Sequence, residues 1–230
     1  MGAMKNRTFC VLVAGVCLCL GRLSADAQNI LPLGDSVTSS FAPHSSYRYW
    51  LYHRLVNAGY NFDFVGTQHG VAGGTPTLTD YDWDHEGHPG WETQDALNNI
   101  DSIARATQPD IVLIDLGSND AEQDIALENT TANLEAIIEH LRAFNPNIVV
   151  ILAQPTPYAG QNNKQMSKLR SAIRKVAKVE NQRDSRVVTV NLYGGFSVNK
   201  DTFDGMHPDE SGEQKIAKHY YDALKKFLHK

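Results

Sequence analysis

Three short polar segments of the sequence carry, between them, the groups that a hydrolytic serine site needs. Each follows an apolar run, and the segments are Gly34-Asp35-Ser36, Gly117-Ser118-Asn119-Asp120 and Asp204-Gly205-Met206-His207. A serine hydroxyl becomes a good nucleophile only when a base removes its proton, and histidine can do this near neutral pH. A carboxylate must then orient the imidazole. Ser36, His207 and Asp204 are the candidates for these three roles.

The order of the segments is more specific than any one of them. A Gly-Asp-Ser tripeptide alone is most often a turn or a helix cap, and Asp-x-x-His alone is usually a surface loop. Asp204 and His207 are three positions apart, so one turn of chain brings the carboxylate to the ring. Active sites of open α/β sheets gather at the carboxyl ends of the strands. The three segments are therefore expected to meet at one edge of a sheet.

The rest of the chain alternates between two patterns, as strands and helices do in an α/β protein. Continuously apolar runs, typical of parallel strands buried on both faces, cover residues 30–33, 62–65, 111–116, 148–152 and 187–190. Apolar stripes with helical spacing cover residues 47–55, 96–103, 134–141, 166–176 and 216–227. This alternation predicts an α/β fold with a mostly parallel sheet of about five strands. Residues 28–230 are expected to form a single domain, with residues 69–90 as its longest irregular stretch.

The first 27 residues have the pattern of a secretory signal peptide. Lys5 and Arg7 precede an apolar run at residues 8–20, and Ala25-Asp26-Ala27 fits a small-residue cleavage site. The run is short for a membrane span, although an uncleaved anchor is the alternative. We therefore expect a secreted, extracellular protein whose mature chain begins near Gln28.

Composition excludes several other classes of function. All three cysteines lie within the predicted signal peptide, at Cys10, Cys17 and Cys19. The mature chain would then have no disulfide, no thiolate nucleophile and no cysteine metal ligand. The formal net charge of −5 gives no reason to expect nucleic acid or an anionic membrane as a partner.

Four sequence blocks in this order resemble the SGNH/GDSL hydrolases over nearly all of the mature chain. The blocks are Leu33-Gly34-Asp35-Ser36, His85-Glu86-Gly87-His88-Pro89-Gly90-Trp91, Gly117-Ser118-Asn119-Asp120 and Asp204-Gly205-Met206-His207. The resemblance implies a three-layer α/β/α fold of the flavodoxin-like kind, with Ser36, Asp204 and His207 as catalytic triad. It also implies that the backbone N–H groups of Ser36 and Gly90 and the side-chain amide of Asn119 stabilise the oxyanion. It implies neither a cofactor nor a metal.

Finer matches resemble the acetyl-xylan esterases of carbohydrate esterase family three. They are Ser46-Tyr47-Arg48-Tyr49-Trp50, residues 58–66 and the His-Glu-Gly-x-x-Gly-Trp run at residues 85–91. The resemblance implies removal of acetyl groups from an acetylated polysaccharide or oligosaccharide, and we expect a monomer. Asp35, His88 and Trp91 are the candidate substrate contacts. Two alternatives are an esterase or lysophospholipase for longer acyl chains, and a catalytically silent carbohydrate-binding domain with the same fold.

The segment at residues 80–88 allows more than one interpretation. It combines His85 and His88 with several carboxylates, which suits a calcium site, but its spacing matches no defined calcium loop and favours a solvated acidic loop. Trp91, Trp83 and Tyr81 have side chains that stack on sugar rings. Packing against the rim of the sheet is an equally good interpretation of Trp91.

Overall fold

The computed structural model describes residues 27–230, so the predicted signal peptide, apart from its last residue, and all three cysteines lie outside the described residues. The described chain contains a seven-stranded sheet with the order β3-β4-β1-β5-β6-β7, and β2 also pairs with β1. The strands are β1 (Gln28–Gly34), β2 (Phe62–Phe64), β3 (Gln68–His69), β4 (Asp84–Gly87), β5 (Ile111–Asp115), β6 (Val149–Gln154) and β7 (Val187–Asn191). Only the pairing of β3 with β4 is antiparallel.

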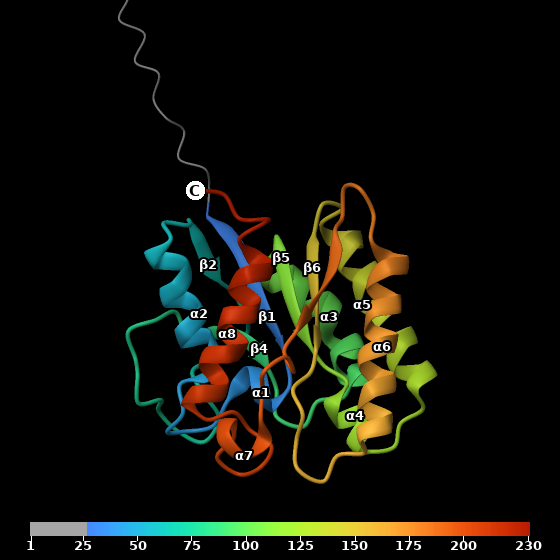
Figure 1. The fold of residues 1–230 in the computed structure, drawn as a ribbon. Coiled ribbons are helices and arrows are strands. Elements are labelled where there is room, and N and C mark those ends of the chain that lie inside the picture. The colour runs from blue at the N-terminus through green and yellow to red at the C-terminus, as the bar shows by residue number, and fades with distance from the viewer. Residues whose placement is uncertain (1–26) are drawn as a thin grey trace, which may run out of the picture.

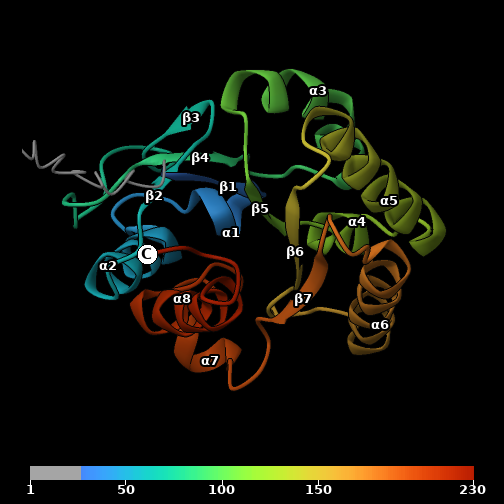
Figure 2. The same ribbon diagram turned by 90° about the horizontal axis from the view of Figure 1, so that it is seen from above.

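Helices cover both faces of this sheet, which confirms the predicted three-layer α/β/α fold. Figure 2 shows α2 and α8 on one face and α3, α5 and α6 on the other. The helices are α1 (Ser36–Ser39), α2 (Ser46–Asn57), α3 (Thr93–Thr107), α4 (Ser118–Glu122), α5 (Leu127–Phe144), α6 (Asn163–Glu180), α7 (Val198–Asp201) and α8 (Glu210–Leu224). The short helices α1, α4 and α7 lie at the lower edge in Figure 1, where the carboxyl ends of the strands also lie.

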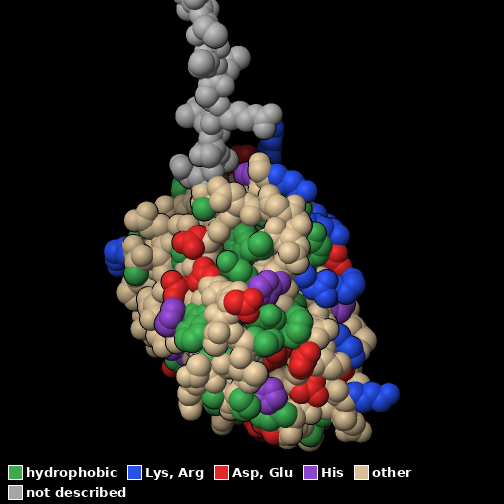
Figure 3. All heavy atoms as spheres, turned by 90° about the vertical axis from the view of Figure 1, so that its left-hand side faces the viewer, with side chains coloured by type: hydrophobic (Ala, Val, Ile, Leu, Met, Phe, Trp, Pro, Cys, Tyr) green, Lys and Arg blue, Asp and Glu red, His purple; other side chains and the backbone are tan. Residues whose placement is uncertain are grey.

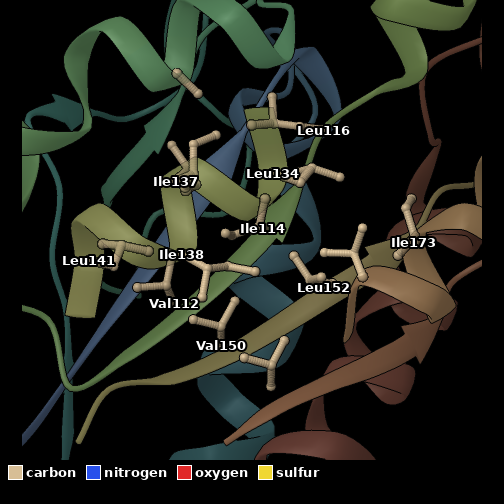
Figure 4. Close-up of a cluster of buried hydrophobic side chains, with 14 of the residues drawn as sticks. Val112, Ile114, Leu116, Leu134, Ile137, Ile138, Leu141, Val150, Leu152 and Ile173 are labelled. Atoms are coloured by element: carbon tan, nitrogen blue, oxygen red, sulfur yellow. The ribbon is translucent and has the colours of Figure 1, made fainter. Parts of the chain in front are cut away.

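Alternation along the central strands divides the core between the two faces. In β5, Val112 and Ile114 point into the cluster formed with α3, α5 and α6, whereas Ile111 and Leu113 point toward α2 and α8. Figure 4 shows the first cluster, in which side chains of β5 and β6 interdigitate with those of α5. Both faces of the central strands are therefore buried, which explains why their sequences are continuously apolar.

The sheet has two more strands than the apolar runs predicted. Both extra strands, β3 and β4, lie outside those runs, and β4 occupies part of the stretch at residues 69–90 that was expected to be irregular. The sequence of β4 is polar, but its polar groups are paired inside the protein. Glu86 accepts hydrogen bonds from the backbone N–H (2.8 Å) and the hydroxyl (2.9 Å) of Thr67. Burial lowers the pKa of His85 to about 2, and its neutral ring accepts the N–H of Gly87.

All five predicted helical stripes lie on helices of the structure, namely α2, α3, α5, α6 and α8. The apolar stripe at residues 216–227 continues beyond the end of α8 into the last turn of the described chain. Of the helices in the described range, none is long and apolar enough to cross a membrane.

Candidate active site

Ser36 begins helix α1 directly after the central strand β1. The chain turns here in very little space, because a Cβ on Gly34 would lie 2.3 Å from the hydroxyl oxygen of Thr38 and 2.7 Å from the carbonyl oxygen of Asp115. Asp35 caps the helix, and its carboxylate accepts the N–H of Val37 at 2.9 Å. A glycine and a capping carboxylate thus hold the serine at the carboxyl edge of the sheet.

Asp204 and His207 lie together in the loop between α7 and α8. One carboxylate oxygen of Asp204 accepts the backbone N–H groups of Met206 (2.9 Å) and His207 (2.7 Å). The other lies 2.6 Å from His207 Nδ1. Partial burial works against ionisation, but the hydrogen bonds from the side chain and backbone of His207 and from Met206 outweigh it and lower the pKa of Asp204. The carboxylate therefore stays ionised and fixes the orientation of the ring.

The imidazole of His207 joins this loop to the serine. Its Nε2 lies 3.0 Å from Ser36 Oγ, so the order Ser36–His207–Asp204 forms a continuous hydrogen-bonded chain. The edge of the His207 ring also packs against Phe41, with ring centroids 4.8 Å apart. This is the geometry in which a base takes the serine proton while a carboxylate holds its other nitrogen.

Of the three oxyanion donors implied by the sequence, two line the same hollow and the third does not. Ser36 and Asn119 line the same hollow, whose volume is about 20 Å³. The amide of Asn119 donates to the carbonyl of Trp91 at 2.8 Å, which leaves its second N–H for a ligand. Gly90 is not among the residues that line this hollow; it has a φ of +85° in a turn closed by the hydrogen bond from Trp91 N–H to the carbonyl of His88. The structure thus brings Ser36 and Asn119 together and holds Gly90 in the segment to which Asn119 is bonded.

Asp120, which follows Asn119, ties the same two segments together from inside the protein. It is buried and accepts the backbone N–H of Thr93 at 2.9 Å, the hydroxyl of Thr93, and the hydroxyl of Thr130 at 3.0 Å. These bonds connect α4 to the start of α3 and to α5. The sequence predicted no role for Asp120, although its place in the Gly-x-Asn-Asp block is a usable signal.

This geometry can be set beside known proteins. A family model described as the GDSL-like lipase/acylhydrolase family matches residues 33–215. The chain belongs to this family.

Individual proteins similar to this chain give a finer comparison. The multidomain esterase of Ruminococcus flavefaciens is 26% identical over 232 residues, which cover 90% of this chain but only 30% of that protein. A crystal structure of an acetyl esterase mutant with acetate ion has a TM-score of 0.78 at 26% identity, covering 86% of this chain and 97% of that one. The family 3 carbohydrate esterase of Clostridium thermocellum has a TM-score of 0.75 at 29% identity, covering 89% and 100%. Within the GDSL-like family, the chain is therefore similar to carbohydrate esterases of family 3.

Two of the three candidate substrate contacts are already engaged by the protein. His88 Nε2 lies 2.6 Å from a carboxylate oxygen of Glu86, and the His88 ring stacks on Trp91 with centroids 3.6 Å apart. Trp91 is half-buried and packs against the cluster beneath α3 and α5. Trp91 thus packs at the rim of the sheet, as one interpretation of the sequence had it. A substrate contact by His88 or Trp91 stays a prediction.

Asp35, the third candidate, lies in the wall of the hollow beside Ser36. Burial raises the pKa of Asp35 to about 6, although the N–H of Val37 and the nearby His207 oppose that shift. Asp115, also buried, has its pKa raised well above the usual value by burial and by the proximity of Asp35. Beside the nucleophile, the carboxyl groups of Asp35 and Asp115 therefore disfavour each other's ionisation.

The acidic segment at residues 80–88 forms hydrogen bonds and ion pairs instead of a ligand cluster. Asp82 accepts the N–H groups of Phe64 (2.9 Å) and Asp84 (3.0 Å), and Asp84 lies 2.8 Å from His69 Nδ1. Figure 3 shows the face to the left of Figure 1, with acidic, histidine and hydrophobic side chains intermixed. Within residues 27–230, no three His, Cys, Asp or Glu side chains form a group that could hold a metal ion.

Proposed function

We propose that this protein is a serine esterase that removes acetyl groups from hydroxyl groups of a plant cell-wall polysaccharide such as acetylated xylan. The observation that carries the proposal is the hydrogen-bonded chain from Ser36 Oγ through His207 to Asp204, at 3.0 and 2.6 Å. It opens into a hollow that Asn119 also lines. A nucleophile, a base with its carboxylate, and an amide donor are the parts that acyl transfer requires.

The mechanism has two steps at the same serine. His207 Nε2 takes the proton of Ser36 Oγ as the oxygen attacks the ester carbonyl, and the N–H of Ser36 and the amide of Asn119 stabilise the oxyanion, with Gly90 as third donor. His207 then gives its proton to the departing alcohol oxygen, which leaves an acetyl-enzyme. Water attacks this ester, again with His207 as base, and releases acetate and free Ser36.

The size of the hollow supports a short acyl group. Its volume of about 20 Å³ holds no more than one or two water molecules. A space of this size suits a group as small as an acetyl methyl. The structural similarity to an acetyl esterase mutant with acetate ion and to family 3 carbohydrate esterases supports the same choice.

Acetate release from acetylated xylan tests the proposal. We expect the wild type to release acetate and Ser36→Ala to lose about 10⁴-fold or more of that activity, because the nucleophile is gone. A silent carbohydrate-binding domain would bind xylan without releasing acetate and would be indifferent to Ser36→Ala.

The preferred length of the acyl chain distinguishes the proposed deacetylase from the remaining enzymatic alternative. We expect p-nitrophenyl acetate to be cleaved with a much higher kcat/KM than p-nitrophenyl octanoate. A preference for octanoate would contradict the deacetylase proposal in favour of an esterase or lysophospholipase for longer acyl chains. We propose further that the enzyme acts outside the cell, and a mature N-terminus near Gln28, found by mass spectrometry of the culture medium, would support this.

A further inference from the structure

An exposed aromatic surface lies directly beside the triad. Phe203 precedes Asp204, is 43% exposed, and is anchored by its N–H, which donates to the carbonyl of His207 at 3.1 Å. Its ring stacks on His44 with centroids 4.1 Å apart and an interplanar angle of 8°. The His207 ring lies 5.8 Å from the same phenyl ring. Phe203 and His44 thus form a surface, here called the aromatic shelf, that borders the catalytic histidine.

The chemistry of acyl transfer decides which part of a substrate reaches this shelf. His207 must hand its proton to the alcohol oxygen that leaves, so the alcohol part of the ester lies on the histidine side of the serine. The oxyanion donors Ser36 and Asn119 line the hollow that takes the carbonyl end. The aromatic shelf therefore borders the alcohol and not the acyl group.

A second, larger hollow adjoins the shelf at His44. It has a volume of about 430 Å³, and His44 belongs to both the shelf and its lining. Its wall also includes Pro43, Thr77, Leu78, Asp209 and Glu210. Carboxylates and a hydroxyl thus stand next to apolar groups in a space large enough for one or more sugar rings. This mixture suits a ligand that has both C–H faces and many hydroxyl groups, and it suits an alkyl chain poorly.

We propose that the aromatic shelf and the adjoining hollow form a subsite for pyranose rings of the alcohol part of the substrate. The inference rests on the proposed function, since it places the sugar chain whose acetyl group enters the hollow at Ser36. The apolar face of the ring carrying the acetyl group packs against Phe203 and His44. Neighbouring rings of the chain extend toward Asp209 and Glu210, whose carboxylates accept hydrogen bonds from sugar hydroxyls. Specificity for the polymer then comes from the loops around His44 and Phe203. Neither residue belongs to the four sequence blocks, although Phe203 directly precedes Asp204, the first residue of the last block.

Comparison of three acetate esters tests this subsite. An acetylated xylo-oligosaccharide reaches the shelf, ethyl acetate has too small an alcohol to cover it, and octyl acetate offers an alkyl chain instead of rings. In Phe203→Ala we expect the ratio of kcat/KM for the oligosaccharide to that for ethyl acetate to fall about tenfold, mostly through KM. Phe203→Tyr should restore most of the ratio, because it keeps the ring.

Phe144→Ala is the matched control. Phe144 is 39% exposed, but it ends α5 next to the start of β6, at the edge of the sheet opposite the site. We expect it to leave the ratio as in the wild type. An equal loss on all three esters in Phe203→Ala would overturn the subsite, since it would mean that Phe203 only supports His207. A larger loss on octyl acetate than on the oligosaccharide would also overturn it, in favour of an alkyl alcohol.

A binding measurement keeps this inference separate from the proposed activity. Isothermal titration of Ser36→Ala with the xylo-oligosaccharide should show binding that weakens about tenfold when Phe203→Ala is added. If the wild type releases no acetate from any ester while this difference in binding persists, the proposed function fails and the subsite stands. If acetate is released from the oligosaccharide but Phe203→Ala changes neither binding nor the ratio, the subsite fails and the proposed function stands.

Discussion

The two faces of the sheet have different interiors. Beneath α3, α5 and α6 the buried cluster is aliphatic, and the buried carboxylate of Asp120 lies at its edge beside the site. On the face of α2 and α8, the buried residues include an apolar cluster and also the charged residues Arg48 and Glu213. Helix α1, which begins with Ser36, packs against α2 on this second face. One face therefore mainly supplies burial of apolar surface, whereas the other also fixes the backbone around the nucleophile.

Arg48 shows how the second face does this. Its side chain is 0% exposed and donates to the carbonyl groups of Thr38 (3.0 Å) and Ser39 (3.2 Å) in α1. It also donates to the carbonyl groups of Trp83 (2.9 Å) and Gly70. Burial lowers the pKa of Arg48, with nearby Tyr81 as the largest opposing influence. One guanidinium therefore connects the nucleophile helix to two loops that are distant in sequence.

Glu213 performs a similar task from α8. Its carboxylate accepts the N–H of Ser46 at 2.8 Å and the hydroxyl of Ser40 at 3.4 Å. Both serines have positive φ, 62° for Ser40 and 70° for Ser46, in a region that side chains other than glycine rarely adopt. Glu213 thus stabilises a strained connection between α1 and α2.

The largest effect expected from this comparison is that of Arg48→Met. The substitution keeps much of the volume but removes a buried charge and its donors to four carbonyl groups, and among the described residues the carbonyl of Ser39 then has no other donor. We therefore expect the free energy of unfolding to fall by about 4 kcal/mol. Because two of these carbonyls belong to α1, kcat of the folded variant should fall as well. Urea unfolding and acetate release on the same sample measure both effects.

Arg48→Lys is the control for charge. An ammonium group has three donors and no planar fork, so it should recover only part of the stability. A loss of less than about 1 kcal/mol in Arg48→Met would contradict the role given to Arg48.

On the aliphatic face, Ile138→Ala should lower the stability of the protein without lowering its kcat. Ile138 is fully buried in α5 and belongs to that apolar cluster (Figure 4). We expect the free energy of unfolding to fall by about 3 kcal/mol, because the removed carbon atoms leave a cavity. The kcat per folded molecule should stay at the wild-type value, because no bond to α1 is lost. A fall in kcat as large as that of Arg48→Met would remove the distinction between the two faces. Ile138→Val should lower the free energy of unfolding by about 1 kcal/mol and gives an intermediate point.

The same contrast explains what the sequence could predict of the fold. The aliphatic face was predictable because its helices repeat apolar residues every three or four positions, as at residues 134–141 and 166–176. Arg48 lies in a helical stripe between Tyr47 and Tyr49, where an arginine is ordinarily exposed. Its partners are carbonyl groups 22 and 35 residues away as well as those of α1, and no periodic pattern marks them. Strand β4 was missed for the same reason, because its polar side chains are paired by contacts distant in sequence.

The candidate site was more predictable than this interior. Ser36, Asn119 and the Asp204–His207 pair each follow a strand or its loop, so topology alone brings them to one edge. The position of the backbone N–H of Gly90 depends on a turn that its sequence does not specify. The aromatic shelf could not be predicted either, since Phe203 and His44 are 159 positions apart in the sequence and meet only in the folded chain.

Glu213→Gln should change the pH dependence of stability. Burial raises the pKa of Glu213 to about 7, against the N–H of Ser46 and the indole N–H of Trp50, which lower it. The folded state therefore binds this proton more tightly than the unfolded state does. As pH rises from 4.5 to 7, the wild type loses stability, because an unfolded Glu213 ionises more easily. A glutamine still accepts the N–H of Ser46 and never ionises. We expect the variant to be more stable than the wild type by about 2 kcal/mol at pH 8.

At pH 4 both proteins carry a neutral side chain at this position, and their unfolding free energies should agree. Thermal unfolding at pH 4, 6 and 8 gives the three points. A difference that stays constant across this range would mean that folding does not raise the pKa of Glu213.

Tyr220→Phe should have the smallest effect and the opposite sign to that of Arg48→Met. Tyr220 lies in α8, on the same face of the sheet as Arg48 and Glu213. It is fully buried, and its ring centroid lies 5.0 Å from that of Tyr47. The hydroxyl of Tyr47 lies near that of Tyr220, but among the described residues the Tyr220 hydroxyl makes no hydrogen bond of normal geometry. A phenylalanine fills nearly the same space without a buried polar atom, so the free energy of unfolding should rise by about 0.5 kcal/mol. A loss above about 1 kcal/mol in urea unfolding would show that the hydroxyl is bonded in solution, for example to a buried water. The expected gain in the free energy of unfolding would instead show that buried polar groups stabilise this face only where they are hydrogen-bonded, as Arg48 and Glu213 are.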